Sequence, residues 1–450
     1  MSSCGCNEFS RSSLLRKAVA QAGEGLPAIE PGMPEPAGTG LSRRKFISRS
    51  AGLALSVYGA SKIPLSAFET GIAQAAPGDK ILVSVFFDGG VDAMSVLAPV
   101  GDPKYAALRP TLGAKLGEGT TFGEDSRLQW HPSAAGLATL HAEQKVSVFP
   151  AIGYDHPDQS HFTSRHYYEI GELNVGFRTG WMGRYLDIVG DEENPLQGLS
   201  MDGSLSPMIA TAQKPVAAID SVDGYDLWAA VSDPVRAEMF KSFAKFGALP
   251  ADSPALAQVR RATAQTDKLR TELGGLGGFT SPVPYPDNYF GHKLAGLAAY
   301  IAAGLPIRVV TISAAGGYDT HSGQAADLSD NLKDTCDGLL AFQRDLENRG
   351  LADRVLVEVW SEFGRRPEEN GSAGTDHGAA GCAFVIGSKA NGQMVGEFPG
   401  LEKLDQNDNL RVTSDFRGMY CSLLEQWLGQ DAGPIIPGAA GFARPTLVKA

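Results

Sequence analysis

Carboxylate and imidazole side chains gather in four short segments of this sequence. Five of the eight histidines lie in these segments, each with an aspartate nearby. Imidazole and carboxylate together suit zinc, manganese or iron, whereas magnesium and calcium favour all-oxygen sites. We therefore expect one or two divalent cations, with zinc as the first choice and manganese or iron as alternatives. The candidate metal ligands are Asp88, Asp319, His321, Asp376 and His377.

The same segments supply a nucleophile and groups for an anionic substrate. Ser160 precedes a helix-like stretch, whose N-terminus would favour an anion. A hydroxyl beside divalent cations can become a nucleophile, because coordination lowers its pKa. Arg165 and Arg365 are candidates for a forked contact with a small anionic ester. His161 is a further candidate for substrate binding.

Each of these residues also has a structural interpretation. Asp88 precedes two glycines and can simply shape a turn. Asp319 and His321 can form a hydrogen-bonded pair within a loop. Asp376 and Ser160 can each cap the N-terminus of a helix. The recurrence of such residues at predicted strand ends favours a functional site over these separate explanations.

Apolar runs precede the polar segments and predict the strands that position them. Continuous apolar runs are typical of strands buried on both faces, and their alternation with helices predicts a mostly parallel, doubly wound α/β sheet flanked by helices. Open α/β sheets bind ligands at the carboxyl ends of their strands, so the polar segments should meet there. The predicted strands are 80–87, 146–152, 307–313, 354–360 and 383–386, and the predicted helices are 133–143, 290–303, 329–348 and 416–428.

The alternation weakens between residues 196 and 286. Helices are expected there at 234–246 and 253–273. We interpret 196–286 as an inserted cap segment on one domain that spans residues 79–450, because no linker separates it from the rest.

The N-terminal region has the order of a bacterial targeting peptide. Arg43 and Arg44 precede a weakly apolar stretch, which ends in Ala73-Gln74-Ala75. This order predicts a twin-arginine signal peptide at 42–76, and an amphipathic first helix is the alternative. Residues 1–41 are expected to be a disordered N-terminal extension. The signal implies the twin-arginine translocase as a partner during export and a periplasmic or extracellular location.

Composition excludes several classes of function. Of the 450 residues, 43% are hydrophobic and 20% are charged. A chain of this length and hydrophobic content can form a large core. A net charge of −12 argues against a nucleic-acid partner, which requires clustered positive charge. No run reaches the roughly 18 apolar residues of a spanning helix, so we expect no integral membrane segment in the mature chain.

Five ordered motifs resemble the bacterial domain-of-unknown-function family 1501, whose members commonly carry twin-arginine signals. The resemblance spans about residues 79–450. It rests on Phe87-Asp88-Gly89-Gly90, Ser160-His161-Phe162, the segment 317–321, Glu362-Phe363-Gly364-Arg365 and the segment 374–378, with a similar closing segment at 413–429. That family is regarded as similar to the alkaline phosphatase superfamily, which hydrolyses phosphate and sulfate esters with a metal pair and a hydroxyl nucleophile. The resemblance therefore implies an alkaline-phosphatase-like fold.

The resemblance also implies roles for individual residues. Asp88 with Asp376 and His377 would hold one metal, and Asp319 with His321 the second. Ser160 would stand at the position of the nucleophile. The histidine that the phosphatases place near their closing helix has no counterpart, because no histidine follows His377. An exported metal-dependent hydrolase of phosphate or sulfate esters is the leading hypothesis, and a non-catalytic exported binding or accessory protein on the same fold is the alternative.

Overall fold

The fold is described from a computed structural model of the chain. It describes residues 57–58, 80–191, 194–219, 232–252, 256, 260, 263 and 280–449. Apart from residues 57–58, the predicted signal at 42–76 lies outside the described residues, with both Arg43 and Arg44. Most of the helix expected at 253–273 lies outside them as well.

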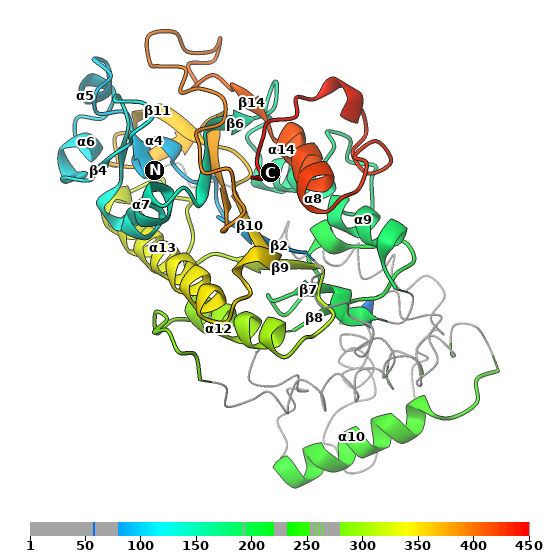
Figure 1. The fold of residues 1–450 in the computed structure, drawn as a ribbon. Helices are drawn as coiled ribbons and strands as arrows, with labels where there is room; N and C mark the ends of the chain where they lie inside the picture. The colour runs from blue at the N-terminus through cyan, green and yellow to red at the C-terminus, as the bar shows by residue number, and fades with distance from the viewer. Residues whose placement is uncertain are drawn as a thin grey trace, which may run out of the picture.

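A nine-stranded sheet runs through the centre of the molecule (Figure 1). Its strand order is β1-β8-β7-β9-β2-β10-β13-β6-β14. Neighbours are parallel from β8 to β10 and again between β6 and β14, whereas β13 runs against both of its neighbours and β1 against β8. The strands are β1 (Val57–Tyr58), β2 (Ile81–Phe86), β6 (Val146–Gly153), β7 (Gly198–Ser200), β8 (Val216–Ala218), β9 (Val309–Ser313), β10 (Val355–Trp360), β13 (Gly381–Ile386) and β14 (Ser414–Asp415).

Helices cover both faces of this sheet, so the predicted doubly wound α/β class is confirmed (Figure 1). Alternate side chains of each strand enter the two cores: in β2, Val83 and Val85 face one core, whereas Leu82 and Phe86 face the other. One core is covered by α7 (Ala135–Ala142), α12 (Tyr289–Ala302) and α13 (Gln324–Asn348). The other is covered by α8 (His161–Ile170), α9 (Trp181–Val189) and α14 (Phe416–Ser422), which continues as a π-helical turn over Leu423–Trp427.

The segment 196–286 contributes to the sheet. Strands β7 and β8 pair in parallel with each other, and β7 pairs in parallel with β9. The early part of this segment therefore belongs to the central sheet. Helix α10 (Asp233–Gly247) lies close to its expected range.

Smaller elements complete the described structure. A three-stranded sheet is made of β3 (Leu97–Ala98), β5 (Gln129–Trp130) and β4 (Thr120–Thr121), and a two-stranded sheet of β11 (Arg365–Glu369) and β12 (Thr375–His377). Three single-turn helices are α4 (Ala93–Val96), α5 (Tyr105–Leu108) and α6 (Leu112–Lys115). Cys336, Cys382 and Cys421 are buried free thiols, as expected of small hydrophobic residues.

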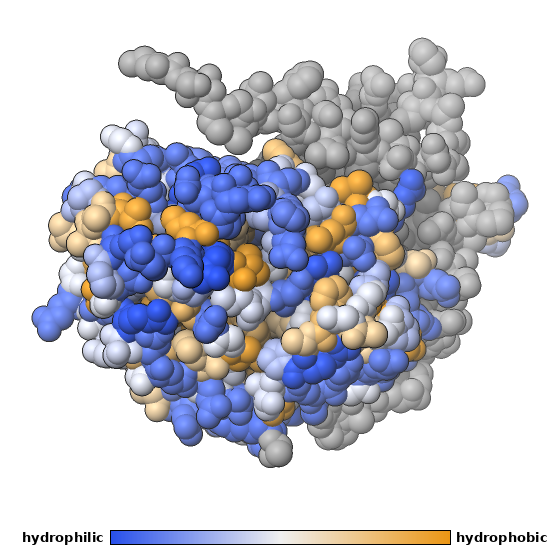
Figure 2. Space-filling model, turned by 90° about the horizontal axis from the view of Figure 1, so that it is seen from above, coloured by the Kyte–Doolittle hydropathy of each residue, from blue (hydrophilic) through white to orange (hydrophobic). Residues whose placement is uncertain are grey.

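Among the described residues, no helix is both long and apolar enough to cross a membrane. The face in Figure 2 is mostly hydrophilic, with small and separate hydrophobic patches. Scattered patches of this kind are ordinary on a solvent-facing protein surface.

Candidate metal centre

Four polar segments meet at the carboxyl edge of the central sheet. Asp88 follows β2, Asp319 follows β9, and Glu362 follows β10. His161 begins α8, which follows β6, and β6 runs parallel to β10 because β13 lies antiparallel between them. The convergence that the strand pattern predicts is therefore present, and the hairpin of β11 and β12 adds His377 to the same place.

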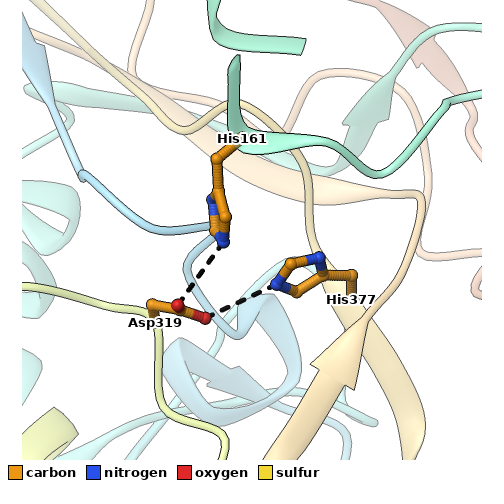
Figure 3. A group of neighbouring side chains, drawn as sticks. All are labelled: His161, Asp319 and His377. Atoms are coloured by element: carbon orange, nitrogen blue, oxygen red, sulfur yellow. Dashed lines mark ion pairs between the residues drawn. The ribbon is translucent and has the colours of Figure 1, made fainter. Parts of the chain in front are cut away.

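Three side chains at this edge form a group that can hold a metal ion. One ligand atom from each of His161, Asp319 and His377 lies within 4.8 Å of the other two. Asp319 Oδ2 lies 3.5 Å from His161 Nε2, and Asp319 Oδ1 lies 3.5 Å from His377 Nε2 (Figure 3). Two imidazole nitrogens and one carboxylate are a donor set that zinc and similar cations accept.

Helix α8 and a buried carboxylate fix the orientation of His161. Its Nδ1 atom lies 2.7 Å from Oε1 of Glu362, a residue with no exposed surface. Glu362 is fixed in turn by hydrogen bonds from the backbone amides of Gly89 (3.1 Å) and Gly90 (2.9 Å) and from the hydroxyl of Ser361 (3.0 Å). The Nε2 atom of His161 consequently faces Asp319.

A backbone carbonyl orients His377 in a similar way. Its Nδ1 atom lies 2.8 Å from the carbonyl oxygen of Gln159, which leaves Nε2 directed at Asp319. The ring of Phe363 packs against both histidines, with centroid distances of 4.9 Å to His161 and 4.8 Å to His377. A second partner on the other ring nitrogen is the usual arrangement for metal-binding histidines.

Asp319 is held by a buried arginine. Arg365 Nη2 donates to Asp319 Oδ1 at 2.6 Å, and the Arg365 side chain has no exposed surface. The same guanidinium donates to the carbonyl oxygens of Gly90 (2.7 Å), Thr375 (3.0 Å) and Gly89. Arg365, predicted as a substrate-binding residue, therefore uses its donors to join the loops that carry the candidate ligands.

Glycine is required where the loop after β2 meets the loop after β9. Gly89 has φ +116°, a backbone conformation that other residues rarely adopt, and a Cβ atom there would collide with the backbone nitrogen of Asp319. This close approach places Asp319 directly over the turn and explains the first glycine after Asp88, whereas a Cβ atom at Gly90 would collide with the ring of Phe363.

Charged contacts stabilise the ionised carboxylate of this group. Burial would raise the pKa of Asp319, but its contacts with His161 and His377 and the hydrogen bond from Arg365 hold it well below its usual range. Burial would lower the pKa of His161, yet its contacts with Asp319 and Glu362 raise it to about 9. Asp319 is thus an anion at neutral pH, as a metal ligand must be.

His321 and Asp376 lie next to the three-residue group. His321 Nε2 is 3.0 Å from both Asp319 Oδ1 and His377 Nε2, and its Nδ1 is 3.2 Å from Asp376 Oδ1. Asp376 is exposed and also accepts a hydrogen bond from Asn370. The predicted ligand Asp376 therefore contacts His321 rather than the three-residue group itself.

Asp88 belongs to a second charged group beside the centre. Its Oδ2 atom lies 3.9 Å from Arg165 Nη1, and Arg165 Nε donates to the buried Glu169 at 2.8 Å. The Arg165 guanidinium also lies over the ring of Phe86, 4.5 Å from its centroid. A third of the Arg165 side chain is exposed, so of the two predicted arginines this one remains accessible to an anion.

Ser160 is the N-cap of α8. Its hydroxyl oxygen accepts a hydrogen bond from the backbone amide of Thr163 at 3.4 Å, and its own amide donates to Asp158. This is the structural role that its position before a helix also allows. Ser160 is half-buried and directly precedes the candidate ligand His161.

Sequence reasoning assigned no role to two residues that support the centre. Glu362 was part of a recognised motif, but nothing in the sequence indicates its contact with His161. Gln324 is fully buried and joins three segments: it donates to Asp92, and its Oε1 accepts from Thr320 (3.0 Å) and Thr375 (2.6 Å).

Comparison with known families identifies the chain. The profile of the family described as "Protein of unknown function (DUF1501)" matches residues 153–422, which is more than half of the sequence. The chain belongs to the DUF1501 family. The matched range contains His161, Asp319 and His377, together with the supporting Glu362 and Arg365. No curated protein shows significant similarity to the chain.

Several solved structures are similar to this DUF1501 protein at low sequence identity. A protein in the alkaline phosphatase superfamily from Vibrio parahaemolyticus has 11% identity and a TM-score of 0.34, with 88% of this chain and 81% of that chain covered. The PsFucS1 sulfatase from Pseudoalteromonas sp. has 13% identity and a TM-score of 0.30, with 89% and 73% covered. Ps i-CgsB in complex with k-i-k-neocarrahexaose has 9% identity and a TM-score of 0.36, with 82% and 75% covered.

Proposed function

We propose that this protein is an exported metal-dependent hydrolase of phosphate or sulfate esters. The observation that carries the proposal is the meeting of one ligand atom each from His161, Asp319 and His377 within 4.8 Å, at the carboxyl edge of the sheet. Two histidines and one carboxylate also make up the protein ligands of some catalytic zinc centres, in which water or substrate takes the fourth position.

The residues fit a divalent cation on chemical grounds. The Nε2 atom of His161 is buried and makes no hydrogen bond of normal geometry within the described protein, which is unusual for a polar atom. The Nδ1 atoms of both histidines already have partners, so their Nε2 atoms are the ones directed inward. A cation held there would supply Lewis-acid stabilisation to the ester oxygens of a bound substrate.

In the proposed reaction the chain supplies a nucleophile and an anion-binding group. The Ser160 hydroxyl attacks phosphorus or sulfur, the bond to the alcohol oxygen breaks, and the alcohol leaves with the serine proton. Water then releases phosphate or sulfate and restores the hydroxyl. Arg165 binds the anionic oxygens with its exposed guanidinium edge while Glu169 fixes the other side of the group.

A non-catalytic binding protein on this fold is the second candidate. The hydrogen bond from the Thr163 amide to the Ser160 hydroxyl favours it, because this contact gives Ser160 a sufficient structural reason to be present. In that case the metal centre would hold the loops together or bind a partner without turning over an ester.

Metal analysis of the purified mature protein tests the proposal. We expect about one zinc, manganese or iron ion per chain, lost in His377→Ala and retained in His292→Ala. His292 is an apt control, because it is an exposed histidine of α12 that pairs only with the exposed Asp287 among the contacts described. Hydrolysis of an aryl phosphate or aryl sulfate by wild type but not by His377→Ala would support catalysis. A folded, metal-free protein that cannot be loaded would contradict both metal-based functions.

Export through the twin-arginine route is part of the proposal and has its own test. Arg43 and Arg44 followed by Lys-Phe-Ile carry it. Replacement of both by lysine should leave the protein in the cytoplasm of the producing bacterium, whereas wild type should reach the periplasm or medium. Equal export of the two forms would contradict the signal assignment.

A further inference from the structure

A row of polar side chains crosses the middle of the central sheet. Thr311 of β9, Ser84 of β2 and Glu358 of β10 are in register with one another, and all three are buried. Adjacent strands lie about 4.8 Å apart, so Ser84 is the direct neighbour of both Thr311 and Glu358 on one face of the sheet. Leu82 and Phe86 of β2 show that this is the face covered by α8, α9 and α14.

Several polar atoms of this region have no hydrogen bond of normal geometry within the described protein. They include both carboxyl oxygens of Glu358 and the hydroxyl of Thr311. The Tyr420 hydroxyl of α14 and the Trp181 indole nitrogen of α9 are also buried without such a hydrogen bond. The rings of these two residues stack with their centroids 4.5 Å apart. Buried polar groups nearly always have a partner, from the protein or from an ordered water molecule.

Within the described residues, no cationic side chain is paired with Glu358. Burial and the Ser84 hydroxyl are the two influences on the pKa of Glu358, and the serine oxygen itself accepts from Trp360 Nε1 at 2.8 Å. After burial, the titratable groups with the largest influence on the pKa of Tyr420 are Glu358 and, in α8, Tyr168 and Glu169, none of them a cation. The three arginines of α8, α9 and α14 are committed elsewhere. Arg165 binds Glu169, Arg184 donates to backbone carbonyl oxygens, and Arg417 donates to Asp415.

We propose that the Glu358 carboxyl is protonated in the folded protein and that Glu358, Thr311 and Tyr420 line a closed internal site that binds water molecules. A protonated carboxyl donates one hydrogen bond and accepts others, and a buried water molecule requires two to four polar partners. An isolated carboxylate in this apolar surrounding would instead remain unpaired, which proteins avoid by keeping the group neutral. The site is independent of the metal centre and of the proposed hydrolase activity.

The proposal has a consequence for the pH dependence of stability. Burial raises the pKa of Glu358 to about 8, whereas in the unfolded chain it is near 4.5. At pH values between these two pKa values, Glu358 is deprotonated in the unfolded state and protonated in the folded state. The unfolding equilibrium constant therefore rises through this window, roughly tenfold per pH unit for this one group, and the effect levels off above the folded pKa.

Comparison of wild type with Glu358→Gln isolates this contribution. The amide keeps the size and hydrogen-bonding capacity of the protonated acid but does not titrate. We expect the ratio of the wild-type to the Glu358→Gln unfolding constant in urea to rise about tenfold per pH unit from pH ~5 to ~8. Glu402→Gln is the control, because Glu402 is a surface residue with 80% of its side chain exposed. A ratio that does not change with pH would overturn the proposal.

Infrared spectroscopy and crystallography complete the test on the wild-type protein, and remain informative if Glu358→Gln does not fold. The carbonyl band of a protonated carboxylic acid should be present at pH 7 and lost at strongly alkaline pH. A high-resolution crystal structure should show water molecules bonded to Glu358. Absence of the band, a cation coordinated by Glu358, or a dry site in the crystal would each overturn the assignment.

Discussion

His161 Nδ1 lies 2.7 Å from Oε1 of Glu362, a carboxylate that is fully buried and has two further backbone donors. This contact fixes which nitrogen of the imidazole faces Asp319. Glu362→Gln should therefore weaken zinc binding about 10- to 100-fold, because the amide cannot reproduce the charge-assisted contact that orients the histidine. Competition with a chelator of known affinity measures the change.

Glu368→Gln is the matched control for that prediction. Glu368 is an exposed residue of β11, and the same substitution there should leave zinc affinity unchanged. Equal zinc affinity of Glu362→Gln and wild type would show that the contact does not support a metal ligand.

The sheet could be predicted from the sequence, whereas the exact ligand group could not. Long apolar runs fixed β2, β6, β9, β10 and β13 within a few residues, but three-residue strands such as β7 carry no periodic signal. The carboxyl edge was predicted as the meeting place of the polar loops. The pairing of His161 with Asp319 depends on strand order and on the Gly89 turn, which no local pattern encodes.

Arg165 and Arg365 should respond differently to the same substitution. Arg365→Lys should lower the free energy of unfolding by about 2–3 kcal/mol, because a buried ammonium cannot replace the several hydrogen bonds of the guanidinium. Arg165→Lys should instead raise the KM for an anionic ester about tenfold, since its exposed edge loses the forked contact. Urea unfolding and steady-state kinetics separate these effects. A KM change confined to Arg365→Lys would show that Arg365, and not Arg165, binds the anionic substrate.

A buried ion pair secures the loop after β2. Arg109 Nη1 donates to Asp92 Oδ2 at 2.6 Å, and both side chains are inaccessible to solvent. Asp92→Asn should cost about 3–5 kcal/mol of stability, because it leaves a buried guanidinium without its counter-charge. The double variant Asp92→Leu with Arg109→Met should lose less stability than the sum of the losses in the single variants Asp92→Leu and Arg109→Met. Additive losses in urea unfolding would show that the two residues are not coupled.

Acid should weaken a surface network of ion pairs beside α13. The network consists of Glu143, Lys145, Arg344 and Glu347. Hydrogen bonds from Arg344 and Lys145 lower the pKa of Glu143 to about 2, below its unfolded value of 4.5. A lowered folded pKa means that its contribution to stability is present above pH ~4.5 and is lost as the pH falls towards ~2. Because a third of the side chain is exposed, about 0.5–1 kcal/mol is expected. Glu143→Gln should remove this slope, and an identical acid profile for wild type and variant would contradict the prediction.

Two substitutions at Ser160 distinguish a nucleophile from a helix cap. Ser160→Ala removes both the hydroxyl and the acceptor for the Thr163 amide, and should cost about 1 kcal/mol of stability. Ser160→Asn keeps an N-cap acceptor, so it should restore that stability without supplying a nucleophile. If Ser160 attacks the ester, both variants bind metal but neither hydrolyses an aryl phosphate or sulfate. Wild-type turnover by Ser160→Asn would assign Ser160 to the cap alone and leave the nucleophile to be found elsewhere.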